Sequence, residues 1–114
     1  MKTYLQFSVD GEILELKTNN KIFNIDHYTD YNNIENVIYN KHNFIILFNN
    51  KLEKKNISVL PFYNNDIYGN FIIFIIDNDK NIKSLTEHKY LKLLNIAKKN
   101  YEDYSSDDFN LSDD

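Results

Sequence analysis

The side chains best suited to acid–base chemistry near neutral pH are three histidines, His27, His42 and His88. A catalytic histidine needs an orienting carboxylate and a nucleophile or metal beside it. His27 has Asp26 and Asp30 nearby, but this segment is rich in Asn and Asp, which commonly cap turns. The other two fall in an expected turn and in an expected helix, and nothing in the spacing brings the three together. The histidines therefore predict no catalytic site.

The sequence also contains no motif that predicts a metal site, a reactive thiol or a phosphate-binding loop. Residues 77–81 resemble the opening of a calcium loop, which needs glycine at its sixth position and glutamate at its twelfth. Ile82 and His88 stand there, so we interpret the segment as a plain turn. The chain has no cysteine, and its two glycines both fit turns rather than a phosphate-binding loop. We expect no catalytic residue, no cofactor, no metal site and no enzymatic activity.

The charge distribution argues against direct binding to nucleic acid. The net charge is −4, and six of the seventeen acidic residues lie after Tyr101, where there is no lysine. Residues 1–101 therefore carry thirteen lysines against eleven acids, a balance of only +2. Arginine, the usual base-reading side chain, is absent. One alternative stays open: a nucleic-acid-associated accessory protein whose acidic tail mimics phosphate.

The fold that holds the side chains discussed above is expected to consist mainly of strands. The first two strands have the most distinct pattern. Apolar and polar residues alternate over 3–9 and 12–18, on either side of Asp10-Gly11, a strong hairpin signal. A two-residue turn there pairs Phe7 with Leu14. It thereby places four apolar residues on one face: Leu5, Phe7, Leu14 and Leu16.

Further elements complete an α+β domain over residues 1–101. Segment 57–63 is strand-like, but Pro61 cannot donate to a ladder, which favours an edge or a bulge. Strands followed by a single helix favour an antiparallel sheet of five or six strands. The other strands are expected at 34–39, 44–48 and 71–76. Turns are expected at 40–43 and 77–81.

The helix is expected to begin at a capping box, with Ser84 as the cap and Glu87 reaching back. Its apolar stripe would be Tyr90, Leu91, Leu94, Ala97 and Tyr101. Residues 102–114 are acidic and are expected to form a disordered tail. The predicted core consists of Leu5, Phe7, Leu14, Leu16, Ile45, Leu47, Ile72, Phe74, Ile76, Leu91 and Leu94.

The second half of the chain resembles small uncharacterised proteins of giant nucleocytoplasmic DNA viruses. The residues that carry the resemblance are Leu60-Pro61-Phe62, residues 66–71, a hydrophobic strand ending at Asp77, and Leu85-Thr86-Glu87 before Tyr90. The Asn-, Ile- and Lys-rich composition is typical of an AT-rich genome. The resemblance implies a viral origin, a small β-rich fold and no known enzymatic activity, and it carries over no functional residue.

The N-terminus fits no signal peptide, and the longest apolar run, 71–76, is far too short to span a membrane. We therefore expect an intracellular protein that is neither secreted nor in a membrane, placed in the host cytoplasm or the virion if it is viral.

The strands at 44–48 and 71–76 are apolar on both faces, so both sides of the sheet must be covered. One helix covers one side. The first hairpin, a second subunit or a foreign partner must cover the other, and we expect association with a protein partner or another copy. The leading hypothesis is a non-enzymatic interaction or structural subunit. The candidate contact residues are Phe71, Ile73 and Ile75, with Asp107 and Asp108 in the tail and Ser105 as a possible phosphorylation site.

Overall fold

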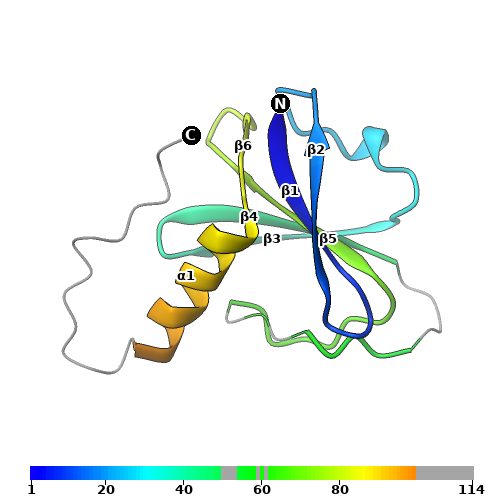
Figure 1. Cartoon of the computed structure of the whole chain (residues 1–114). Helices are drawn as coiled ribbons and strands as arrows, with labels where there is room; N and C mark the ends of the chain where they lie inside the picture. Colours follow the sequence, from blue (N-terminus) through cyan, green and yellow to red (C-terminus); the bar gives the residue numbers. More distant parts are fainter. Residues whose placement is uncertain (50–53, 59, 61, 100–114) are drawn as a thin grey trace.

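The protein folds as a six-stranded antiparallel sheet with one α-helix, which confirms the predicted α+β class. The computed structural model (Figure 1) describes residues 1–49, 54–58, 60 and 62–99, with side chains as far as Leu93. The predicted acidic tail, 102–114, lies outside these residues. The elements are β1 Lys2–Phe7, β2 Ile13–Thr18, the 3₁₀ helix η1 Ile25–His27, β3 Asn33–Tyr39, β4 His42–Phe48, β5 Phe71–Ile76, β6 Ile82–Lys83 and α1 Glu87–Lys99.

The strand order is β2-β1-β5-β4-β3, so β5 lies at the centre and β2 and β3 are the outer strands. The short β6, which was not expected, pairs with the end of β5 on the side of β1. In Figure 1, β1 and β2 run steeply across the direction of β3 and β4, as in a strongly twisted sheet.

The first hairpin forms, but its register differs from the prediction by one residue. Phe7 lies opposite Ile13 instead of Leu14. Because neighbouring residues of a strand point to opposite faces, this shift moves Leu14 and Leu16 away from the face of Leu5 and Phe7. Leu14 is 54% exposed, so its assignment to the core was wrong.

The cause lies in the connection between the two strands. Ser8 N–H donates to the carbonyl of Glu12 at 2.9 Å, and Gly11 N–H donates to the carbonyl of Ser8 at 2.9 Å. Gly11 has φ +90°, a backbone conformation that side chains disfavour. The chain thus turns over residues 8–12 rather than at Asp10-Gly11 alone.

The second hairpin, between β3 and β4, is tighter than expected. Tyr39 pairs with His42, which leaves only Asn40 and Lys41 in the turn. Both have positive φ, 52° and 67°, as a type I′ turn requires.

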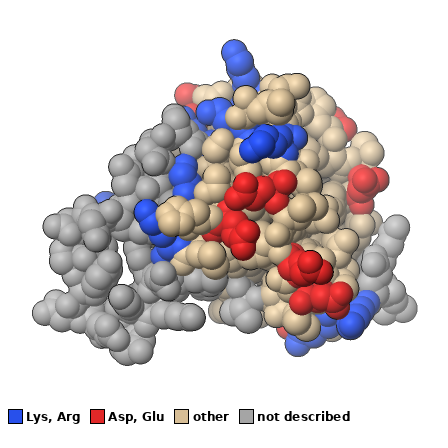
Figure 2. Space-filling model, viewed as in Figure 1, with Lys and Arg blue, Asp and Glu red and all other residues tan. Residues whose placement is uncertain are grey.

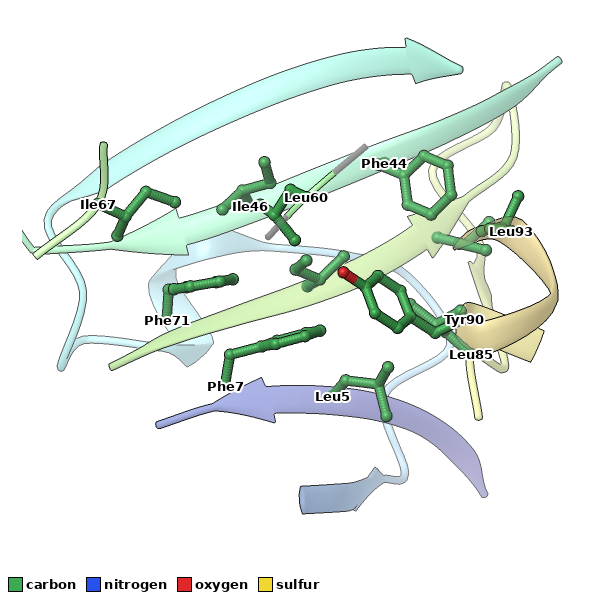
Figure 3. Close-up of a cluster of buried hydrophobic side chains, with 12 residues drawn as sticks. Leu5, Phe7, Phe44, Ile46, Leu60, Ile67, Phe71, Leu85, Tyr90 and Leu93 are labelled. Atoms are coloured by element: carbon green, nitrogen blue, oxygen red, sulfur yellow. The ribbon is translucent and has the colours of Figure 1, made fainter. Parts of the chain in front are cut away.

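One face of the sheet is covered by α1 and by the segment 54–70 (Figure 3). The rings of Phe7 and Phe71 stack with centroids 4.9 Å apart, and the ring of Tyr90 meets that of Phe7 edge-on at 5.0 Å. Leu60 and Ile67 contribute from the irregular segment. The described residues of 57–63 form no strand, so the prediction of an edge strand there was wrong.

The opposite face is covered by residues 19–32, which include η1. The ring of Phe74 on β5 stacks on Tyr4 at 4.4 Å and contacts Phe23 at 5.3 Å and Tyr28 at 5.0 Å. A polar segment without periodicity therefore supplies aromatic side chains that cover this face.

The predicted contact residues Phe71, Ile73 and Ile75 are consequently buried inside the chain's own core. The sequence correctly indicated that both faces of β5 are covered, but the first hairpin extends the sheet instead of folding over it. These three side chains form no exposed contact surface, so the two apolar faces of β5 give no reason to expect association.

The cap of α1 also differs from the prediction. Thr86 caps the helix: its Oγ1 accepts from Lys89 N–H at 3.2 Å, and its carbonyl accepts from Tyr90 N–H at 3.0 Å. Ser84 Oγ instead accepts from the N–H of Thr3 at 3.1 Å, which joins the start of β1 to the segment before the helix.

The buried stripe of α1 contains Tyr90 and Leu93, whereas the predicted core residue Leu91 is 44% exposed. The side chain of Leu94 lies outside the described residues. Leu16 is only partly buried. The remaining core predictions are confirmed: Leu5, Phe7, Ile45, Leu47, Ile72, Phe74 and Ile76. Within the described residues, no helix is long and apolar enough to cross a membrane.

Candidate interaction surface

Among the described residues, no strand pairs with the outer edge of β3. Its partner β4 lies on one side, and β3 ends the strand order on the other. The two-residue turn makes Tyr39 and His42 a hydrogen-bonded pair, so alternate residues of β3 from Asn33 to Tyr39 bond to β4. The residues between them, Ile34, Asn36 and Ile38, direct their N–H and C=O groups outward. These backbone groups can bond to another strand.

The side chains of the same three residues share one face of the sheet. Ile34 lies opposite Leu47 and Asn36 lies opposite Ile45, so they continue the face that residues 19–32 cover. Ile38 is 76% exposed and Ile34 is 43% exposed. The edge therefore combines backbone groups that point away from β4, and that bond to no other described strand, with two exposed isoleucines.

The two outer strands differ in how they are protected. Natural edge strands are commonly blunted by charged side chains, proline or bulges. β2 carries Glu15 and Lys17 in its middle. β3 pairs with β4 without interruption over seven residues, contains no proline, and has Glu35 as its one charge. By these criteria β3 is the less protected edge.

A pocket of about 350 Å³ lies beside the β3–β4 turn. Lys41, His42 and Lys83 line it, and the buried Asn43 Oδ1 finds no hydrogen-bond partner among the described residues. Burial lowers the pKa of His42 below its ordinary 6.5, and the charge of Lys89 lowers it further.

The carboxylate at this pocket is already engaged. Asp77 Oδ1 accepts from the N–H groups of Asp79 at 2.9 Å and Asn81 at 2.8 Å, and Oδ2 accepts from Asn81 Nδ2 at 3.0 Å. These bonds lower the pKa of Asp77, which suits a turn-forming carboxylate and not a general base. They also confirm that 77–81 is a turn.

The three histidines are not assembled into a site. His27 is exposed on η1, His88 is exposed on α1, and His42 begins β4. Among the described residues, no group of three or more His, Asp or Glu side chains is placed to hold a metal ion.

Charges of both signs are mixed over the face shown in Figure 2. Two lysines that could have contributed to a basic patch lie beside acids: Lys54 Nζ is 3.6 Å from Asp10 Oδ1, and Lys55 Nζ is 3.3 Å from Asp66 Oδ1. This mixture differs from the basic stripe that a nucleic-acid-binding surface typically presents.

The predicted site residues that the structure describes lie away from the β3 edge. Phe71, Ile73 and Ile75 are in the core, and Ser105, Asp107 and Asp108 lie outside the described residues. Ile34 and Ile38 were not among the contact residues predicted from the sequence. A usable signal was present in the sequence, because the strand expected at 34–39 carries a single charge and precedes a turn.

No family model, curated protein or solved structure matches this chain. The resemblance to proteins of giant DNA viruses therefore stays a prediction.

Proposed function

We propose that this protein is a non-enzymatic interaction subunit that binds an extended protein segment along the edge of β3 that faces away from β4. The observation that carries the proposal is the coincidence of outward backbone groups with the exposed side chains of Ile34 and Ile38. Strand addition works in this way: main-chain hydrogen bonds supply affinity, and alternate side chains supply specificity.

The chemistry of the partner follows from this edge. Ile34 and Ile38 are four residues apart on one face of β3, so a partner strand gains most by placing apolar side chains opposite both. Glu35 is the only charge on the strand, and the edge therefore selects through shape and apolar contact more than through charge.

The test compares two exposed four-carbon aliphatic side chains, one on each outer strand. Ile38→Lys places a charge on the β3 edge, whereas the control Leu14→Lys makes the same kind of change on β2. Both residues are more than half exposed, so we expect both variants to remain folded. Proteins recovered with the full chain from its native source would then be identified by mass spectrometry.

We expect a specific partner to be recovered with the wild type and with Leu14→Lys, and to be lost with Ile38→Lys. Asn36→Pro is a second β3 variant, because it removes an outward N–H without removing a bond to β4. Recovery that is unchanged by both β3 variants would refute strand addition at this edge.

A further inference from the structure

We infer that the β3 edge binds the β3 edge of a second copy of this chain, antiparallel, with a two-fold axis through Asn36. The inference rests on the proposed function because it uses the same edge, and it names the occupant. The result would be a continuous sheet across two subunits. Closed two-fold pairing is the commonest symmetry among homo-oligomers.

The first argument is the match of the backbone groups. Ile34, Asn36 and Ile38 are the residues of β3 whose N–H and C=O groups point outward. With the axis at Asn36, each outward residue meets an outward residue of the other copy: Ile34 meets Ile38, and Asn36 meets Asn36. Each such pair exchanges two hydrogen bonds, so every outward group of these residues is satisfied.

The second argument is the match of the side chains. In this register each exposed isoleucine lies opposite an isoleucine of the other copy. A shift by two residues in either direction keeps the outward groups aligned but places an isoleucine opposite Asn36. Apolar pairs directly opposite each other stabilise a sheet, and Ile38 is largely exposed in the single chain. The two-fold register is therefore favoured over its neighbours.

The third argument is the placement of charge. Glu35 is the one charged residue of β3, and the register sets it opposite Val37 of the other copy. No like charges then face each other directly. The two Glu35 side chains are diagonal neighbours, so we expect Glu35→Gln to tighten the association, by about twofold to fivefold.

The expected affinity is modest. A contact confined to one pair of strands lies at or below the lower end of specific interfaces, about 1,200 Å² in total. We therefore expect dissociation in the micromolar range, and a dimer fraction that rises with concentration in sedimentation equilibrium. Ile38→Lys should weaken the association at least about tenfold, whereas Leu14→Lys should leave it unchanged.

The register can be tested directly because the chain contains no cysteine. Asn36→Cys would place two thiols opposite each other in a hydrogen-bonded pair, with Cα atoms about 5.5 Å apart. That separation lies within the range of disulfides, about 4.4–6.8 Å. Mild oxidation should give a covalent dimer with Asn36→Cys and not with Asn19→Cys, a matched control at an exposed residue just beyond β2.

A second cross-link covers the case in which Asn36→Cys does not fold. Ile34→Cys and Ile38→Cys should each stay monomeric alone, but a mixture of the two should form a heterodimeric disulfide, because these positions meet only across the axis. That result would support the same register independently.

Two results would overturn the inference. One is a wild-type chain that stays monomeric at several hundred micromolar. The other is cross-linking of Asn36→Cys no faster than that of Asn19→Cys. If a foreign partner is still lost with Ile38→Lys, the proposed function stands without the second copy. If neither binding of a foreign partner nor association with a second copy depends on β3, both proposals fail.

Discussion

The carboxylate of Glu15 on β2 accepts a hydrogen bond from the backbone N–H of Glu87, with Oε2 and N 2.8 Å apart. Glu87 is the first residue of α1, so a side chain 72 positions away satisfies one of the helix's free N–H groups. The negative charge also lies at the positive end of the helix dipole. This bond fixes the start of α1 over the sheet.

We predict that Glu15→Ala lowers the free energy of unfolding by about 1 kcal/mol, since it removes both the acceptor and the charge. Glu15→Gln keeps an acceptor and loses the charge, so its effect should be smaller. Urea unfolding of the variants provides the measurement. The control is Glu12→Ala, an exposed glutamate in the first turn, which should change stability by less than about 0.5 kcal/mol. Equal losses in Glu15→Ala and Glu12→Ala would contradict the capping role.

The sequence predicted those parts of the fold that follow from a regular pattern. The six apolar residues of β5 required cover on both faces, and the structure provides it. The pattern could not show which segments provide it, because residues 19–32 and 54–70 have no periodicity. Phe23 and Ile67 lie in polar stretches and Leu60 stands next to Pro61, so only their tertiary contacts show that they are core.

The register of the first hairpin shows a different limit. Residues 12–18 include Ile13, Leu14 and Leu16, so an apolar residue can be placed inward in either of two registers. The backbone bonds of Ser8 and the positive φ of Gly11 decide between them, and neither can be read from residue types. The β3 edge was missed for a related reason, since the place of a strand in the sheet is a property of the whole topology.

The buried Asn56 joins three parts of the chain. Its Nδ2 donates to the carbonyls of Phe7 at 3.2 Å and Gly69 at 2.8 Å, and its Oδ1 accepts from Ser58 N–H at 2.9 Å. Asn56→Ala would remove these three bonds, two of them buried, and each buried group left without a partner costs about 1–3 kcal/mol. We predict a loss of about 3 kcal/mol in the free energy of unfolding.

The control for Asn56 is Asn65→Ala, an exposed asparagine in the same segment, which should cost less than about 0.5 kcal/mol. Amide hydrogen exchange gives a second measurement. Exchange at Ser58 should accelerate in Asn56→Ala and not in Asn65→Ala. A loss below about 1 kcal/mol with unchanged exchange would show that Asn56 does not join these segments.

The hydrogen bonds in the turn after β5 lead to a prediction about the pKa of Asp77. Hydrogen bonds from Asn81 are the largest cause of its lowered pKa. Replacing Asn81 with Ala removes the side-chain donor, so the pKa of Asp77 should move up toward its ordinary 3.8. An NMR titration of the Asp77 carboxyl carbon measures this directly. Asn78→Ala, which alters an exposed residue of the same turn, should leave the midpoint in place. An unchanged midpoint in Asn81→Ala would rule out the assigned cause.

His42 makes stability depend on pH. Burial lowers the pKa of His42 in the folded protein. As the pH falls past 6.5, the unfolded chain therefore binds a proton at His42 more readily than the folded protein does. The stabilisation contributed by neutral His42 is therefore complete above pH 6.5 and is lost as the pH falls through the folded-state pKa. We predict that His42→Gln reduces the slope of unfolding free energy against pH between 6.5 and about 5, above the range in which most carboxylates titrate. The exposed His88 supplies the control, since His88→Gln should retain the wild-type slope in urea unfolding at each pH. A titration midpoint for the His42 ring at or above 6.5 would contradict the prediction, because the folded state would then bind the proton at least as well as the unfolded chain.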